Sequence, residues 1–147
     1  MALCPSPRVL ELPPSPDDLP PGPRVLGLLD REEWTAAAAA ARAWAEKAPL
    51  DAAARYCLGK ALEQVAETEA IGAFRQAVYL DPGFALAHFH LATLYQRLGQ
   101  RDLAERHRRA TLAALAGIAK DAALPCGQGF TARDLAAVMA APVGAGQ

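Results

Sequence analysis

The 147-residue sequence is poor in aromatic residues, which make up 6 % of it although 52 % of its residues are apolar. A β-sandwich or β-barrel core needs runs of β-branched and aromatic side chains, so the composition argues against both. Alanine instead supplies much of the apolar content, with 35 residues. Because alanine has the highest helix propensity and lets helices approach closely, we expect an all-α protein. The length favours a single domain.

Charge excess and long apolar runs are also missing. The 15 basic residues balance 16 acidic ones, which removes the electrostatic basis for binding nucleic acid. The most apolar window, from Thr35 to Ala45, is short and contains Arg42, so we expect no membrane insertion. The N-terminus lacks the basic region and apolar run of a signal peptide, and we therefore expect a cytoplasmic protein.

Proline is concentrated near the N-terminus, where eight of the 12 prolines lie between Pro5 and Pro23. This density disfavours helix and favours extended, solvated backbone. We expect residues 1–23 to be a proline-rich disordered tail or linker, with a ligand for an aromatic groove as the alternative. We expect residues 142–147 to be a second disordered tail.

The sequence between residues 24 and 119 repeats itself. Pro49 and Pro82 are 33 residues apart, and nine residues after each proline stands a leucine followed by a small residue, Leu58 and Leu91. The spacing defines units of 33 or 34 residues, each predicted to be a pair of helices. The expected units are 24–48, which is degenerate, 49–81 and 82–116. Helices are expected within them over residues 24–29, 32–47, 69–80, 84–98 and 102–116.

Two motifs resemble the tetratricopeptide (TPR) repeat. They are Ala70-x3-Phe74-x2-Ala77-x4-Pro82, similar to a second TPR helix, and Leu91-Ala92-x2-Tyr95-x3-Gly99, similar to the first helix of the next unit. Small residues at such positions let helices touch, and the aromatic residues fill the gaps between them. The resemblance implies a TPR-like helical-hairpin solenoid of about 2.5 repeats.

The C-terminal region is expected to cover the open end of this solenoid. Residues 120–130 read as a loop, and residues 131–141 as a capping helix. Thr131 and Asp134 form a shortened capping box, in which the hydroxyl accepts from a first-turn amide. Leu135, Val138 and Met139 give this helix an apolar face.

A narrower resemblance involves residues 79–91 and 95–99, which are similar to the TPR region of chemotaxis-type protein-glutamate methyltransferases, the CheR family. The Leu124-Pro125 loop and Gly129-Phe130-Thr131 are similar to the end of those proteins. The resemblance implies a bacterial chemosensory module whose partner is a chemosensory protein, a receptor or a methyltransferase domain, and which modulates a receptor methyltransferase. The alternative is a cis-acting regulatory C-terminal domain of such an enzyme.

No catalytic constellation, cofactor motif or metal site is recognisable, so we expect a non-catalytic module. His88 and His90 are two residues apart on a predicted helix and point about 200° away from each other, while His107 lies on another helix. The three cysteines are too widely spaced to indicate a disulfide framework or a zinc site. Cys57 is expected to face a neighbouring helix as a small hydrophobic residue.

The partner is expected to bind in the groove that the first helices of the units line. Phe89 is the strongest single candidate, either as an anchor for a partner segment or as an ordinary core residue. The predicted groove residues are Tyr56, Lys60, Glu63, Phe89, Thr93, Gln96 and Arg97. A possible basic patch, either a solvated face or a landing site for an acidic helix, comprises Arg101, Arg106, Arg108 and Arg109.

Overall fold

The computed structural model describes residues 19–140, which fold into seven helices. Their bounds are α1 (Pro21–Asp30), α2 (Trp34–Lys47), α3 (Ala52–Leu62), α4 (Glu67–Leu80), α5 (Ala85–Arg97), α6 (Arg101–Ala116) and α7 (Ala132–Ala140). The described residues contain no strand beyond an isolated bridge between Ala123 and Thr131. The predicted all-α fold is therefore confirmed. The expected tails at residues 1–18 and 142–147 lie outside the described part.

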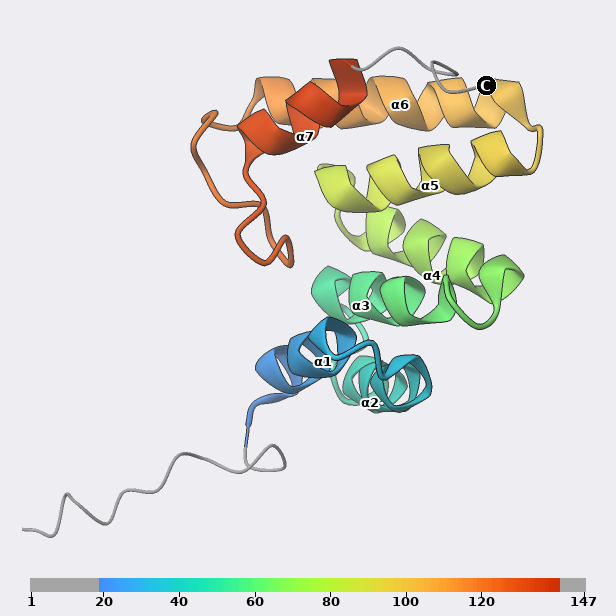
Figure 1. The fold of residues 1–147 in the computed structure, drawn as a ribbon, viewed down its shortest axis with the longest axis vertical. Coiled ribbons are helices and arrows are strands. Elements are labelled where there is room, and N and C mark those ends of the chain that lie inside the picture. The colour runs from blue at the N-terminus through green and yellow to red at the C-terminus, as the bar shows by residue number, and fades with distance from the viewer. Residues whose placement is uncertain (1–18, 141–147) are drawn as a thin grey trace, which may run out of the picture.

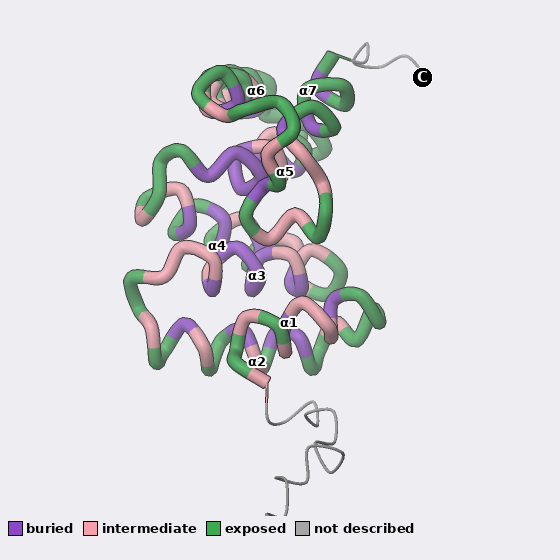
Figure 2. The backbone as a smooth tube through the Cα atoms, turned by 90° about the vertical axis from the view of Figure 1, so that its left-hand side faces the viewer, coloured by how far each residue is buried: buried purple, intermediate pink, exposed green. Residues whose placement is uncertain are grey.

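The helices pair as antiparallel hairpins, α1 with α2, α3 with α4 and α5 with α6, and the hairpins stack on one another (Figure 1). Figure 2 shows two sides of this stack, with α2, α4 and α6 on one side and α1, α7 and the segment before α7 on the other. We call the side presented by α1, α3 and α5 the inner face, and residues 117–131 the C-terminal loop. None of the described helices combines the length and the hydropathy that crossing a bilayer requires.

Helix α1 begins at Pro21, inside the segment expected to be an extended tail. Prolines disrupt the interior of a helix, but Pro21 and Pro23 occupy its first turn, where backbone N–H groups have no partner within the helix. Gly22 lies against the ring of Trp44 on α2, which a Cβ at residue 22 would meet at 3.5 Å. The expectation that these prolines exclude a helix is wrong for this turn.

Alanine is the most frequent residue in the core, with 11 of its 27 buried members, and Phe74 lies among them. Phe74 is fully buried and stands on α4, whereas Gly59 opposite it stands on α3. A Cβ on Gly59 would lie 2.7 Å from the Phe74 ring. Only glycine therefore lets α3 and α4 approach this closely around an aromatic ring.

The predicted capping box at the start of α7 is confirmed. The Asp134 amide donates to the Thr131 hydroxyl at 3.2 Å, and the Thr131 amide donates to the Asp134 carboxylate at 2.9 Å. The bond from the Thr131 amide, and next the interaction of the carboxylate with the Thr131 hydroxyl, keep the pKa of Asp134 below its usual value. Leu135 and Met139 are buried, whereas Val138 is 46 % exposed and does not belong to the packed side of the helix.

We expect Gly59→Ala to destabilise the protein by about 1–3 kcal/mol, because the buried Phe74 ring cannot yield to an added methyl group. Gly72→Ala is the matched control, since an added Cβ at this exposed α4 position meets nothing within 4 Å. It should raise stability by about 0.5–1 kcal/mol through helix propensity. Thermal unfolding followed by circular dichroism measures both, and equal effects would contradict the packing described.

Candidate functional site

A hydrogen-bonded chain of three side chains joins α3 to α5 beside the inner face. His90 lies between Glu63 and Tyr56, with 2.6 Å from its Nδ1 to the Glu63 carboxylate and 3.1 Å from its Nε2 to the Tyr56 hydroxyl. The carboxylate can only accept in this arrangement, so the imidazole Nδ1–H donates to it, while Nε2 forms the second hydrogen bond with the Tyr56 hydroxyl. The His90 ring also stacks on Phe74, with their centroids 5.0 Å apart.

Tyr56 does not face a partner, contrary to the sequence-based prediction. It is 2 % exposed, and its ring stacks on Phe84 with a centroid separation of 4.9 Å. Burial, chiefly, raises the pKa of its hydroxyl well above the usual value. Glu63 is likewise mostly buried and is engaged by His90, so it supports the inner face instead of offering a free charge.

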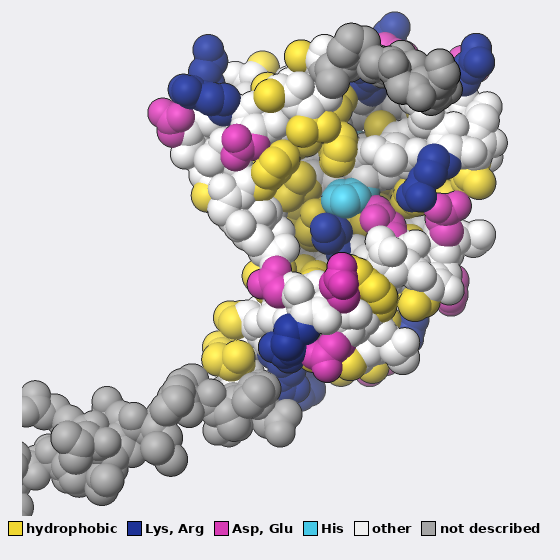
Figure 3. Space-filling view, in the orientation of Figure 1, with side chains coloured by type: hydrophobic (Ala, Val, Ile, Leu, Met, Phe, Trp, Pro, Cys, Tyr) yellow, Lys and Arg dark blue, Asp and Glu magenta, His cyan; other side chains and the backbone are white. Residues whose placement is uncertain are grey.

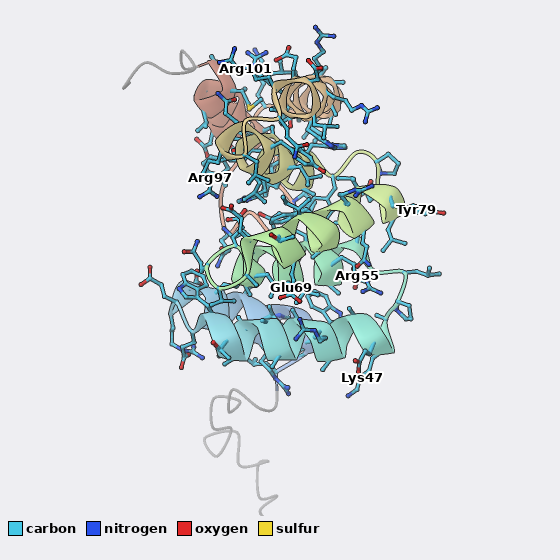
Figure 4. The ribbon with its side chains drawn as sticks, turned by 90° about the vertical axis from the view of Figure 1, so that its right-hand side faces the viewer. Lys47, Arg55, Glu69, Tyr79, Arg97 and Arg101 are labelled. Carbon is cyan, nitrogen blue, oxygen red and sulfur yellow. The ribbon has the colours of Figure 1, made fainter. Side chains whose placement is uncertain are left out.

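The other predicted groove residues range from partly buried to exposed. Lys60 on α3 is half-buried, and Thr93 and Gln96 on α5 are exposed. Phe89 is partly buried against the core, with its ring edge-on to His90 at 5.5 Å. Arg97 is exposed and pairs with Glu67 of α4 at 3.3 Å. Figure 4 shows Arg97 on the opposite side of the stack from Lys47 and Tyr79.

The C-terminal loop returns along the inner face toward the first hairpin (Figures 1 and 2). Gln128 donates from Nε2 to the Leu26 carbonyl oxygen at 3.4 Å and also bonds the Asp30 carboxylate, both on α1. Within the loop Leu124 is 4 % exposed and forms part of the core. The loop therefore connects α7 to α1.

Cys57 and Cys126 meet where this loop reaches α3, which the sequence reasoning missed. Their sulfur atoms are 4.0 Å apart, and both thiols are free. Cys57 is fully buried, as expected of a small hydrophobic residue, but its neighbour is a cysteine from the loop and not only a helix. No repeat-length spacing links two residues that are 69 positions apart, so the sequence carried no signal for this contact.

A second histidine contact lies on the other side of α5. The Nδ1 atoms of His88 and His107 are 3.0 Å apart, and His88 Nε2 is 2.8 Å from the Pro82 carbonyl oxygen. Because that carbonyl can only accept, His88 donates to it and accepts from His107. Burial, chiefly, and the nearby His88 together lower the pKa of His107 to about 4. Among residues 19–140, no group of three or more potential ligands is placed to hold a metal ion.

The predicted basic patch on α6 is partly neutralised by its own helix. Arg109 and Arg108 approach Glu105 at 3.2 Å and 3.8 Å, and Arg101 and Arg106 are exposed.

An open groove with a volume of about 750 Å³ lies between α6 and α7. Its floor is apolar, with Leu112, Leu115 and Ile118 among the lining residues. In Figure 3, hydrophobic side chains gather on the upper part of the inner face, next to a histidine.

Comparison with known proteins relates this geometry to solved helical repeats. A structure of MamA from Desulfovibrio magneticus RS-1 has 28 % identity and a TM-score of 0.60, and covers 64 % of this chain and 54 % of its own. A MamA RS-1 double mutant has 27 % identity and a TM-score of 0.61, with 64 % and 53 % covered. MamA AMB-1, at 24 % identity and a TM-score of 0.58, shares the fold. No protein-family model and no curated protein matches the chain.

The likeness to these structures confirms the TPR-type helical-repeat fold predicted from the two motifs. The chain spans about half the length of the MamA structures it matches. The finer resemblance to the CheR family has no counterpart among these structures.

We expect the His88–His107 contact to make the fold acid-sensitive. The pKa of His107 falls from 6.5 to about 4 on folding, so the unfolded chain binds a proton that the folded chain does not. Stability should therefore decline as the pH falls from 6.5 toward 4. Because the ring is only half-buried, we expect a loss of about 1 kcal/mol.

The matched variant is His107→Gln, whose amide can still donate to His88. Its denaturant midpoint should fall less than that of the wild-type chain across this pH range, while the two curves run parallel above about pH 7. Parallel curves across the acidic range as well would contradict the assignment.

Proposed function

We propose that the chain is a protein-interaction module that binds a segment of a partner protein on its inner face, beside the C-terminal loop. The placement of α3 and α5 carries this proposal. Lys60, Thr93 and Gln96 stand on neighbouring first helices and remain accessible. The Glu63–His90–Tyr56 chain fixes the spacing of these two helices, which gives the face a rigid base.

Rigidity favours binding because little conformational freedom is lost when a partner docks on preformed helices. A partner segment with a carboxylate beside Lys60 would gain an ion pair at the edge of this surface. Phe89 is partly buried, packing against the core and His90, so it supports such a surface without standing free as an anchor. TPR-type stacking, shared with the MamA structures, is the fold-level support.

The setting we propose is a bacterial chemosensory or signalling pathway, in which the module modulates a receptor methyltransferase. The similarity of residues 79–91 and 95–99 to CheR-family TPR regions supports this setting. The alternative is a regulatory domain that acts in cis on a methyltransferase. An in-frame methyltransferase domain encoded beside this sequence would favour the alternative, and its absence from the gene would favour a partner bound in trans.

We expect a photo-crosslinking amino acid at Thr93 or Gln96 to capture the same partner in cells of the native host. The same residue at Tyr79 is the matched control, since Tyr79 is 78 % exposed and points away from the inner face (Figure 4). Mass spectrometry identifies the captured proteins. Equal capture from position 79, or capture of different proteins from positions 93 and 96, would contradict the proposed face.

Lys60→Glu is expected to weaken binding of the captured partner by about tenfold, because it reverses a charge at the edge of the surface. Lys47→Glu makes the same charge change on the far side of the stack and should leave binding unchanged. Calorimetry with the purified partner measures both, and circular dichroism verifies that helical content is preserved. Equal losses in the two variants would indicate a nonspecific charge effect.

A further inference from the structure

The cysteine contact between α3 and the C-terminal loop has the geometry of an oxidisable site. We propose that Cys57 and Cys126 form a redox-active pair, which a hydroperoxide converts into a disulfide that fastens the C-terminal loop to α3. The proposal concerns a covalent modification of the chain and does not depend on the binding face proposed above.

The sulfur atoms are already close, at 4.0 Å. A disulfide needs about 2.05 Å between sulfur atoms, and rotation of the two side chains about their Cα–Cβ bonds can supply a change of this size. The backbone around Cys126 is meanwhile held by the loop itself. The Gly127 amide donates to the Leu124 carbonyl at 2.9 Å, and the Phe130 amide donates to the Gly127 carbonyl at 3.0 Å.

The turn that presents Cys126 is unusual for a cysteine. Pro125 precedes Cys126, and the φ of Cys126 is 62°, in the left-handed region. In a turn where proline comes directly before such a residue, that residue is normally glycine or asparagine. A cysteine adopts this conformation at a cost, which a glycine would avoid. A strained backbone that holds its side chain beside a second thiol gives the cysteine a role that packing alone does not explain.

The two cysteines have different access and acidity, which assigns their roles. Cys57 is fully buried and cannot meet an oxidant in solvent, whereas Cys126 is only partly buried. The Cys57 thiol donates to the Cys126 sulfur, and this hydrogen bond lowers the pKa of Cys126. The same hydrogen bond and burial raise the pKa of Cys57. Cys126 is therefore the attacking thiolate and Cys57 the resolving thiol.

The chemistry proceeds in two steps. The Cys126 thiolate attacks the distal oxygen of the hydroperoxide, and with one proton taken up this gives a sulfenic acid on Cys126 and an alcohol, or water when the oxidant is hydrogen peroxide. The Cys57 sulfur then attacks the Cys126 sulfur, which releases the hydroxyl with the Cys57 proton as water. Each sulfur is oxidised by one electron, and the peroxide O–O bond takes up both.

The test uses the full chain with Cys4→Ser, so that only the pair can react. The folded protein is treated with stoichiometric hydrogen peroxide, alkylated and digested with trypsin. We expect a linked product of the peptides Tyr56–Lys60 and Asp121–Arg133, and a Tm higher by about 5–10 °C that reverts on reduction. Two thiols that stay fully alkylatable, or a link that forms only in denaturant, would overturn the proposal.

Three variants separate the steps. Cys57→Ala should leave a sulfenic acid on Cys126 that dimedone traps, whereas Cys126→Ser should leave Cys57 reduced under the same treatment. Gln128→Ala removes the loop's bonds to α1 and should slow formation of the linked product several-fold. Dimedone labelling of Cys57 in the Cys126→Ser variant would overturn the assigned roles, and an unchanged rate in Gln128→Ala would overturn the view that the anchored loop holds Cys126 in place for the reaction.

Discussion

The close approach of α3 and α4 around the Phe74 ring is the constraint on which the rest of the stack depends. Gly59 provides the space for the ring, and His90 of the next hairpin stacks on it with its plane 6° from parallel. The same imidazole then bonds Tyr56 on α3 and Glu63 at the C-terminal end of that helix. One aromatic ring thus fixes a helix hairpin, and the histidine stacked on it fixes the next hairpin relative to the first. A fully buried Phe contributes about 3–5 kcal/mol relative to Ala, a large share of the stability of a small domain.

The spacing of His88 and His90 shows how one helix serves two neighbours. Residues two apart on a helix point in nearly opposite directions, which argues against a shared metal ion. In the structure this property sends His90 toward α3 and His88 toward His107 on α6. Helix α5 therefore makes a polar contact on each of its sides. The imidazoles of His88 and His90 each have a hydrogen-bond partner at both ring nitrogens, as buried polar groups require.

The sequence was sufficient to predict the repeats, because their pattern is local and periodic. Ala70, Phe74 and Ala77 recur at the spacings at which helices touch, and all three are fully buried. Periodicity failed at Tyr56, which occupies a groove position of the repeat but is covered by Phe84 and by His90. It also failed at Cys126, because the C-terminal loop follows no repeat. A contact made by a segment that returns along the stack leaves no mark on the spacing of the residues it meets.

This returning loop changes the physics of the stack. In a simple solenoid each hairpin contacts only its neighbours, so the two ends are independent and unfold separately. Here Gln128 bonds α1 across 102 residues of sequence, and Cys126 contacts α3. Closing so long a loop costs chain entropy, but this cost grows only slowly with loop length. A single closure also brings all the loop's contacts with the earlier helices into place. The same loop leads into the capping box of α7. Unfolding of the loop would therefore remove contacts of both the N-terminal hairpin and α7, which couples the stability of the two ends.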